Sequence, residues 1–136
     1  MFSLGNNCVA NMSLGGRFSQ TQNMAVADAV DAGVTIVVAA GNDNTNACTV
    51  SPASNSKAIT VGHDIFRCKV WVGFSNCGSC VDVWAPGSSI TSVCYTSDTV
   101  TCIKSGTSMA SPRKFTFCFV SSCVLICICL SILIFY

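Results

Sequence analysis

The chain has 136 residues, which is enough for one modest domain with its own hydrophobic core. Its 7 Lys and Arg residues and 6 Asp and Glu residues give a net charge of +1, so we expect no basic face that binds nucleic acid. Hydrophobic residues make up 51% of the sequence, a high fraction for a soluble domain, and much of this excess lies in residues 115–136.

The 11 cysteines bear on the cellular compartment and on metal binding. Those that precede residue 113 are Cys8, Cys48, Cys68, Cys77, Cys80, Cys94 and Cys102. Such heavy use of cysteine indicates an oxidising compartment, with some disulfides and at least one thiol left over. A zinc site needs a tight Cys/His cluster, and Cys77 and Cys80 form the only closely spaced pair in this part of the sequence. The pattern therefore favours disulfides over zinc.

The first 40 residues alternate between strand and helix patterns. Residues 8–14 alternate weakly between apolar and polar side chains and run into Gly15 and Gly16, as a strand does when it enters a turn. Residues 21–33 place apolar side chains at helical spacing and end on Gly33, a frequent helix terminator. Residues 34–40 form a continuous apolar run that is typical of a strand buried on both faces of a parallel sheet. Residues 8–40 are thus predicted to form a βαβ unit.

Shorter strand candidates follow, separated by Gly, Ser, Pro and Asn; they are residues 58–62, 70–75, 80–87 and 89–93. The whole pattern predicts an α/β fold with a mainly parallel central sheet. In such sheets, active groups gather beyond the carboxyl ends of the strands. Residues 13–16 and 39–42 stand at two of these ends, which makes them candidates for a functional site.

Two polar side chains have both a functional and a structural explanation. Ser108 lies among small residues in "SGTSMASP" and is a candidate nucleophile, although the first turn of a helix also favours serine. Asn42 follows a glycine after the buried strand, so its amide could project into a crevice as a hydrogen-bond donor, but Gly-Asn is also a common turn sequence. Taken singly, neither residue decides between the two explanations.

Taken together, these segments resemble one family, the subtilisin-like serine proteases or subtilases, and within it the proteinase K-like branch. The matching segments occur in the family's order and at similar separations, over about residues 8–112. They are "NMSLGG" (11–16), "AAGN" (39–42), "SPAS" (51–54), "TVG" (60–62), "FSN" (74–76), "WAPG" (84–87) and "SGTSMASP" (105–112).

This resemblance implies a three-layer subtilisin-like fold, of which the chain holds the C-terminal part, and a serine endopeptidase that works through an acyl-enzyme. By resemblance, Ser108 takes the position of the nucleophile and Asn42 that of the oxyanion-hole residue. Two segments take the positions of walls around an extended peptide substrate, and they comprise Ser13, Leu14, Gly15, Ala39, Ala40 and Gly41. The family's typical substrate is a peptide bond after an apolar or aromatic residue.

The resemblance also implies a structural calcium ion, although the reaction itself requires no cofactor. In the proteinase K-like branch, an aspartate at the position of Asp82 forms a calcium site with main-chain carbonyls near Ser56 and Ala58. Oxygen ligands of this kind suit a hard cation. The alternative is that Asp82 is simply an aspartate on the solvent-facing side of a strand.

Two cysteine pairs follow from the same resemblance. Relatives in this branch carry a disulfide at the positions of Cys48 and Cys80, and closing that loop would stabilise the fold by roughly 3–4 kcal/mol. Cys94 with Cys102 is a second candidate pair.

The catalytic base is missing from the matching segments. Subtilases take their aspartate and histidine from segments well upstream of the position of Ser13, and neither motif occurs here. The single histidine, His63, follows "TVG", where relatives carry a small structural residue, so we do not expect it to act as the base of Ser108. A serine without a base retains its proton, and only binding and oxyanion stabilisation remain. The chain alone is therefore expected to be close to inactive.

Residues 113–136 depart from the family pattern. Residues 115–136 carry no charge and are long enough to span a bilayer, so a membrane contact through this segment is one hypothesis and a buried core helix is another. Arg113 and Lys114 precede the segment, and the positive-inside rule would then place residues 1–112 in the cytoplasm. That side of the membrane does not suit a disulfide-bearing domain of the secreted type. We therefore favour a truncated or mis-assembled sequence over a genuine tail anchor.

The sequence thus predicts a partial subtilase catalytic domain over residues 1–112, followed by an apolar tail over residues 113–136. Its parent activity is cleavage of polypeptides, its expected location is secreted or extracellular, and nucleic acid is not an expected partner. The alternative from another functional class is a non-catalytic, membrane-anchored or interaction protein that derives from a subtilase.

Overall fold

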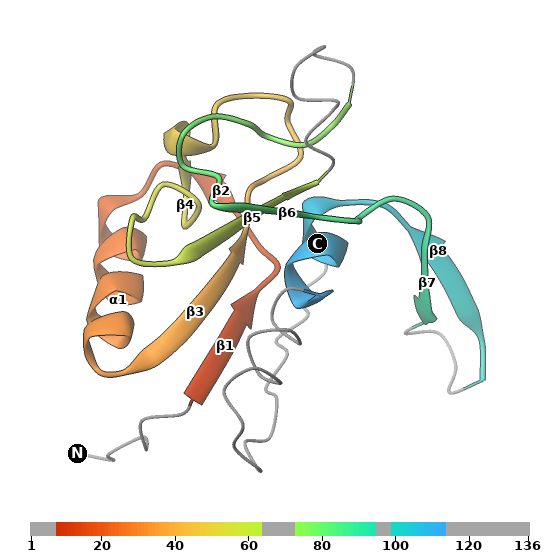
Figure 1. Cartoon of the computed structure of the whole chain (residues 1–136), viewed down its shortest axis with the longest axis horizontal. Helices are drawn as coiled ribbons and strands as arrows, with labels where there is room; N and C mark the ends of the chain where they lie inside the picture. The colour runs from red at the N-terminus through yellow and green to blue at the C-terminus, as the bar shows by residue number, and fades with distance from the viewer. Residues whose placement is uncertain (1–7, 64–72, 95–98, 114–136) are drawn as a thin grey trace.

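The computed structural model describes residues 8–63, 73–94 and 99–113. Their centre is a four-stranded sheet in the order β1-β3-β5-β6, in which every neighbouring pair is parallel (Figure 1). These strands are β1 (Cys8–Met12), β3 (Val34–Ala39), β5 (Ile59–His63) and β6 (Val83–Ala85). The α/β class and the mainly parallel sheet that the sequence predicts are confirmed.

The predicted βαβ unit is present as β1, helix α1 (Gln20–Asp31) and β3. Helix α1 begins after Ser19, whose Oγ accepts a hydrogen bond from the backbone N–H of Gln22 at 3.3 Å. It ends before Gly33, whose φ of +94° is a conformation that favours glycine. The helix predicted over residues 21–33 is therefore correct to within two residues at each end.

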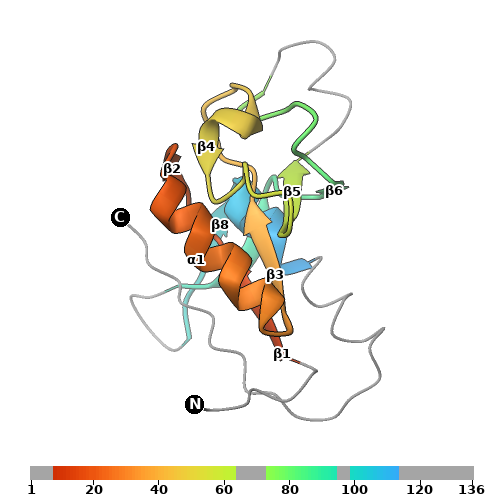
Figure 2. The ribbon, with the colours of Figure 1, turned by 90° about the vertical axis from the view of Figure 1, so that its left-hand side faces the viewer.

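Strand β3 is buried between two layers, with α1 on one face of the sheet and the helical residues 107–113 on the other (Figures 1 and 2). Alternate side chains of β3 enter different cores, because successive residues of a strand point to opposite faces. Val38 packs with Val26 of α1, whereas Val37 packs with Ala110 of the second helical segment. Both valines are 0% exposed, which explains the continuous apolar run in the sequence.

Three small elements complete the described part. A two-stranded sheet pairs β2 (Gly16–Arg17) with β4 (Val50–Ser51), and a hairpin pairs β7 (Ile90–Val93) with β8 (Thr101–Lys104). A short 3-10 helix, η1, covers Ala47–Thr49. Of the strand predicted over residues 70–75, residues 73–75 adopt no strand conformation and residues 70–72 lie outside the described part.

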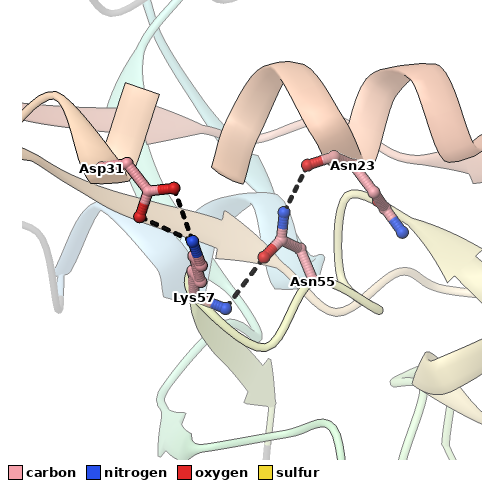
Figure 3. A network of polar contacts seen from close by, with 4 residues as sticks. All are labelled: Asn23, Asp31, Asn55 and Lys57. Atoms are coloured by element: carbon pink, nitrogen blue, oxygen red, sulfur yellow. Dashed lines mark hydrogen bonds and ion pairs between the residues drawn. The ribbon is translucent and has the colours of Figure 1, made fainter. Parts of the chain in front are cut away.

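A buried asparagine fastens the turn before β5 to helix α1 (Figure 3). Asn55 is 8% exposed; its Nδ2 donates to the carbonyl of Asn23 at 2.6 Å, and its Oδ1 accepts from the N–H of Lys57 at 2.8 Å. The nearby ion pair between Lys57 and Asp31 is about half exposed, so solvent screens it and its contribution to stability is small. The buried amide is therefore the stronger link between the turn and α1.

Two disulfides lie within the described residues. Cys48 in η1 is bonded to Cys80, with Cα atoms 5.3 Å apart, and this is the pair that the resemblance named. Cys94 and Cys102 are bonded across the β7–β8 hairpin, with Cα atoms 5.5 Å apart. The first disulfide spans 32 residues of sequence and the second spans 8.

None of the helices in residues 8–63, 73–94 and 99–113 is long and apolar enough to cross a membrane. The membrane span considered for residues 115–136 lies outside this part of the chain.

We predict that removing the longer disulfide destabilises the fold more than removing the shorter one. A disulfide restricts the unfolded chain more strongly when it closes a longer loop, so Cys48→Ser/Cys80→Ser should lower the free energy of unfolding by roughly 3–4 kcal/mol and Cys94→Ser/Cys102→Ser by roughly 2–3 kcal/mol. Denaturant titration under non-reducing conditions measures both changes. Under reducing conditions the difference between each variant and the parent chain should disappear; a larger loss for the shorter loop would contradict the prediction.

Candidate active site

Ser108 lies in the first turn of the helical residues 107–113, directly beyond the carboxyl end of β1. Its main chain and side chain are both tied to Ser13, which follows that strand. The Oγ of Ser13 donates to the carbonyl of Ser108 at 2.8 Å, and the Oγ of Ser108 donates to the carbonyl of Ser13 at 3.2 Å. This reciprocal pair fixes the candidate nucleophile against β1.

Two buried polar side chains, Asn11 and Ser111, link this pair to the rest of the helix. Ser111, which is 0% exposed, donates through Oγ to the Oδ1 of Asn11. The Nδ2 of Asn11 then donates to the Oγ of Ser13 at 2.9 Å. Because Ser111 and Ser108 share one turn of helix, these bonds form a closed ring that joins the helix to β1.

Thr107, the residue before Ser108, is bonded to the segment after β3. The Oδ1 of Asn42 accepts two hydrogen bonds from Thr107, one from its N–H at 2.8 Å and one from its Oγ1 at 2.9 Å. The Oγ1 of Thr107 in turn accepts from the N–H of Gly41 at 3.2 Å. Since the backbone N–H of Thr107 must face an oxygen, the orientation of the Asn42 amide is settled, and its Nδ2 finds no acceptor among the described residues.

Gly106 leaves open a small space that two donors border. A Cβ atom at Gly106 would lie 3.6 Å from the Nδ2 of Asn42 and 3.7 Å from the backbone N of Ser108. The N–H of Ser108 belongs to the first turn of a helix, where backbone donors have no acceptor within the helix. A side-chain nitrogen and a backbone nitrogen, both of which carry N–H groups, therefore border the same point next to Gly106, and such a pair of donors can hold a negatively charged oxygen.

A pocket of about 200 Å³ opens next to this point. Of the residues that the sequence places at the site, Leu14, Gly15, Ala39, Gly41, Asn42 and Ser108 line it. Gly16, the last residue of the candidate segment 13–16, also lines it, as do Asp43, Val50 and Thr107, to which the sequence analysis assigned no place in the site. Gly16 and Val50 lie in β2 and β4, whose two-residue length gives no periodic signal in the sequence.

Two predicted wall residues support the pocket without lining it. Ser13 holds Ser108 through the bonds described above. Ala40 is 0% exposed, and its carbonyl accepts a hydrogen bond from the Nδ2 of Asn76 at 2.9 Å. The alternation of side chains along the chain leaves Ala39 at the pocket and turns its neighbour into the interior.

His63 bonds to residues other than Ser108, as expected from its position in the sequence. It is 7% exposed at the end of β5, and its ring stacks on Phe74 with the two centroids 5.0 Å apart. Its Nδ1 accepts from the N–H of Gly87 at 2.8 Å, and its Nε2 lies 2.7 Å from the Oγ of Ser88. Both ring nitrogens are thus engaged, and the residue has a structural role.

Asp82 retains part of its capacity to bind a cation. Its Oδ2 accepts from the backbone N–H of Thr60 at 2.7 Å, which holds the exposed carboxylate beside β5. Its other oxygen, Oδ1, has no hydrogen-bond partner among the described residues. The described residues contain no group of three or more His, Cys, Asp or Glu side chains that could bind a metal, so a cation at Asp82 would need main-chain carbonyls as additional ligands.

Comparison with known proteins agrees with this geometry. The subtilase family matches residues 4–113. The chain belongs to that family. It is 56% identical over 105 residues to the extracellular serine proteinase of Thermus sp. (strain Rt41A), a match that covers 77% of this chain and 25% of the relative. It is 53% identical over 104 residues to cerevisin of Saccharomyces cerevisiae, covering 76% of this chain and 16% of cerevisin.

Solved protease structures show the same fold. The crystal structure of a cold adapted subtilisin-like serine proteinase matches 85% of this chain and 40% of that protein, with a TM-score of 0.72 and 42% sequence identity. A protease from Pseudoalteromonas arctica PAMC 21717 matches 77% of this chain and 35% of that protein, with a TM-score of 0.66 and 32% identity. The chain therefore spans a quarter or less of these two curated relatives and two fifths or less of these solved proteins.

The contacts of His63 predict a loss of stability when the residue is replaced. His63→Leu should lower the free energy of unfolding by about 1–3 kcal/mol, because the buried N–H of Gly87 loses its acceptor. Ser88→Ala is the matched control: it removes only the exposed partner of the same ring and should cost less than about 1 kcal/mol. Urea titration measures both, and equal stability of His63→Leu and the parent chain would show that the ring is not a structural anchor.

Proposed function

We propose that this chain forms the part of a subtilisin-like serine endopeptidase that carries the nucleophile, the oxyanion hole and a substrate pocket. The observation that supports the proposal best is the position of Ser108. Ser108 lines a pocket of about 200 Å³ together with Asn42, and the Nδ2 of Asn42 and the backbone N of Ser108 both border the space beside Gly106. Membership of the subtilase family supports the same reaction.

In this reaction the Oγ of Ser108 attacks the carbonyl carbon of the scissile peptide bond, and the carbonyl oxygen becomes an oxyanion. The Nδ2 of Asn42 and the backbone N–H of Ser108 donate to that oxyanion, and they stabilise it more than the neutral carbonyl. When the intermediate collapses, the C–N bond breaks, the amine leaves with the proton that the base took from Ser108, and an acyl group remains on Ser108. Water then hydrolyses the ester, which restores the serine.

The proton of the Ser108 hydroxyl needs a base, and residues 8–63, 73–94 and 99–113 place none beside it. The sequence holds one histidine, and both of its ring nitrogens bond elsewhere. The Ser108 Oγ donates instead to the carbonyl of Ser13, which cannot accept a proton at neutral pH. We therefore propose that the catalytic histidine and aspartate come from outside this sequence, as subtilase membership implies, and that the chain alone is close to inactive.

The proposed substrates are polypeptides. Leu14, Ala39 and Val50 give the pocket apolar walls, and its glycines leave it open, which suits an apolar or aromatic side chain next to the cleaved bond. We also propose that the protein is secreted: the Thermus relative is named extracellular, and the disulfides of the described residues suit an oxidising compartment.

A hybrid enzyme tests this function. The 105 matched residues of the Thermus proteinase are replaced by the corresponding residues of this chain, so that the remainder of the relative supplies the missing segments. We expect the hybrid to hydrolyse casein and Ser108→Ala to abolish this activity. Asn42→Ala should lower kcat by about 10²–10³-fold, because one oxyanion donor is lost.

The isolated 136-residue chain, assayed beside the hybrid, should show no hydrolysis of casein. A hybrid that folds, as judged by circular dichroism, but does not cleave casein would refute the proposed function. Activity that survives Ser108→Ala would refute the assignment of the nucleophile.

We propose in addition that Asp82 binds a structural calcium ion through its Oδ1. Calcium should then raise the melting temperature of the chain, since a ligand at 100 times its Kd stabilises the folded state by about 2.7 kcal/mol. Asp82→Asn should abolish this rise while Asn keeps an oxygen to accept from Thr60, and Asp28→Asn, an exposed aspartate of α1, should preserve it. A calcium response that persists in Asp82→Asn would place the ion elsewhere.

A further inference from the structure

The segment that carries Asn42 is held in place by a second asparagine that the reaction itself does not use. Asn76 is 0% exposed and is one of the largest fully buried side chains of the described residues. A buried amide is costly unless its hydrogen bonds are made, so the partners of this side chain indicate what it holds.

Among the described residues, the hydrogen bonds of the Asn76 side-chain amide all go to residues 40–45. Its Oδ1 accepts from the N–H of Asp43 at 3.0 Å, from the N–H of Thr45 at 3.0 Å and from the Oγ1 of Thr45 at 3.2 Å. Its Nδ2 donates to the carbonyl of Ala40 at 2.9 Å. The two ends of the loop are thereby fixed to one rigid, planar group.

These bonds lie on both sides of Asn42. The backbone N–H of Asn76 donates to the carbonyl of Gly41 at 2.9 Å, and its Oδ1 holds the N–H of Asp43. The residues before and after Asn42 are therefore both bonded to Asn76. Asn42 itself is exposed, and its side chain is held only by Thr107 among the described residues.

The loop and Asn76 fit so closely that no side chain can stand between them. Gly41 has a φ of +100°, and a Cβ atom there would overlap the Nδ2 of Asn76. Only glycine adopts this conformation without strain and allows this approach. The Ala-Gly-Asn sequence and Asn76 thus form one packed unit, although they lie far apart in the chain.

We propose that Asn76 is a positioning residue that sets the direction in which Asn42 donates to the oxyanion. The inference rests on the proposed function of Asn42. Its mechanism is indirect: Asn76 fixes the peptide groups on either side of Asn42, Thr107 fixes the Oδ1 of Asn42, and the Nδ2 is left facing the space beside Gly106. Loss of Asn76 would loosen the loop and misdirect the donor.

Asn55 provides a matched control within the same chain. It is also a buried asparagine whose Oδ1 accepts from a backbone N–H and whose Nδ2 donates to a backbone carbonyl. Its partners are Lys57 and Asn23, in the turn beside α1, and it makes no bond to the loop that carries Asn42 (Figure 3). The same substitution at Asn55 reports the general cost of removing a buried amide.

The first test uses the 136-residue chain and amide hydrogen exchange followed by NMR. In Asn76→Ala, the amides of Asp43 and Thr45 should exchange at least about 10-fold faster, because they lose their acceptor, while the amides of β3 keep their rates. In Asn55→Ala, the amide of Lys57 should exchange faster and those of Asp43 and Thr45 should not change. If Asn76→Ala does not fold, the isosteric Asn76→Asp replaces it, since its second oxygen repels the carbonyl of Ala40 and displaces the loop.

Unchanged exchange at Asp43 and Thr45 in a folded Asn76 variant would overturn the inference. So would equal acceleration in the Asn55 and Asn76 variants, because the loop would then respond to general loss of stability alone.

The second test is kinetic and uses the hybrid enzyme. Asn76→Asp should lower kcat by roughly 10- to 100-fold, with KM changed by less than about twofold, because a misdirected donor affects the transition state more than substrate binding. In an Asn42→Ala background, Asn76→Asp should cause no further fall in kcat, because the group that it positions is absent. Asn55→Asp should leave kcat unchanged.

A fall in kcat of the same size in both backgrounds would show that Asn76 does not act through Asn42 and would overturn the inference. The two proposals also fail separately. A folded but inactive hybrid refutes the proposed function, whereas amide exchange in the 136-residue chain still shows whether Asn76 holds the loop.

Discussion

The site depends on one constraint: the first turn of the helical residues 107–113 is fixed to the carboxyl ends of two adjacent parallel strands. Ser13, after β1, bonds to Ser108 across 95 residues of sequence, and Asn42, after β3, bonds to Thr107 across 65. Because β1 and β3 are neighbours in the sheet, the two attachments arise from a single strand pairing. The register of that pair therefore determines where Ser108, the proposed nucleophile, lies relative to the pocket.

The absence of a side chain at two glycines allows the donors around Ser108 to face an open space. At Gly106 the absence of a side chain leaves space beside the two N–H donors, and at Gly41 it allows the loop to approach Asn76. Asn42 can then be exposed to substrate while the atoms around it are buried and bonded. Preorganisation of this kind is what makes an oxyanion hole effective, since donors that already point at the oxyanion need no reorganisation during the reaction.

The sequence could predict those parts of the fold whose signals are local. The apolar run at residues 34–40 identified β3, because a strand buried on both faces has an apolar residue at almost every position. The helical spacing before Gly33 identified α1 and its end, because both signals lie within a few residues. The motifs also identified Ser108 and Asn42. What could not be predicted depends on contacts between distant segments: the short pairing of Gly16 with Ser51, the inward turn of Ala40 and the bonds of Asn76 to residues 40–45. The motif "FSN" was visible in the sequence, but the bonds of its last residue, Asn76, to the loop could be recognised only from the structure.

In the proposed reaction, the described residues hold the groups that bind the substrate and the oxyanion separately from the group that would transfer the proton. The donors, the pocket and the backbone of Ser108 are held by contacts within the described residues, so none of them requires the histidine or the aspartate to be in place. The hydroxyl of Ser108 is the exception, because it donates to the carbonyl of Ser13. A base that approaches Ser108 must compete for this proton, at the cost of a neutral hydrogen bond worth about 0.5–1.5 kcal/mol. Rotation of a single hydroxyl is a small change. In the proposed reaction, this part of the fold therefore prepares the binding of the transition state, and proton transfer depends on the part that brings the base.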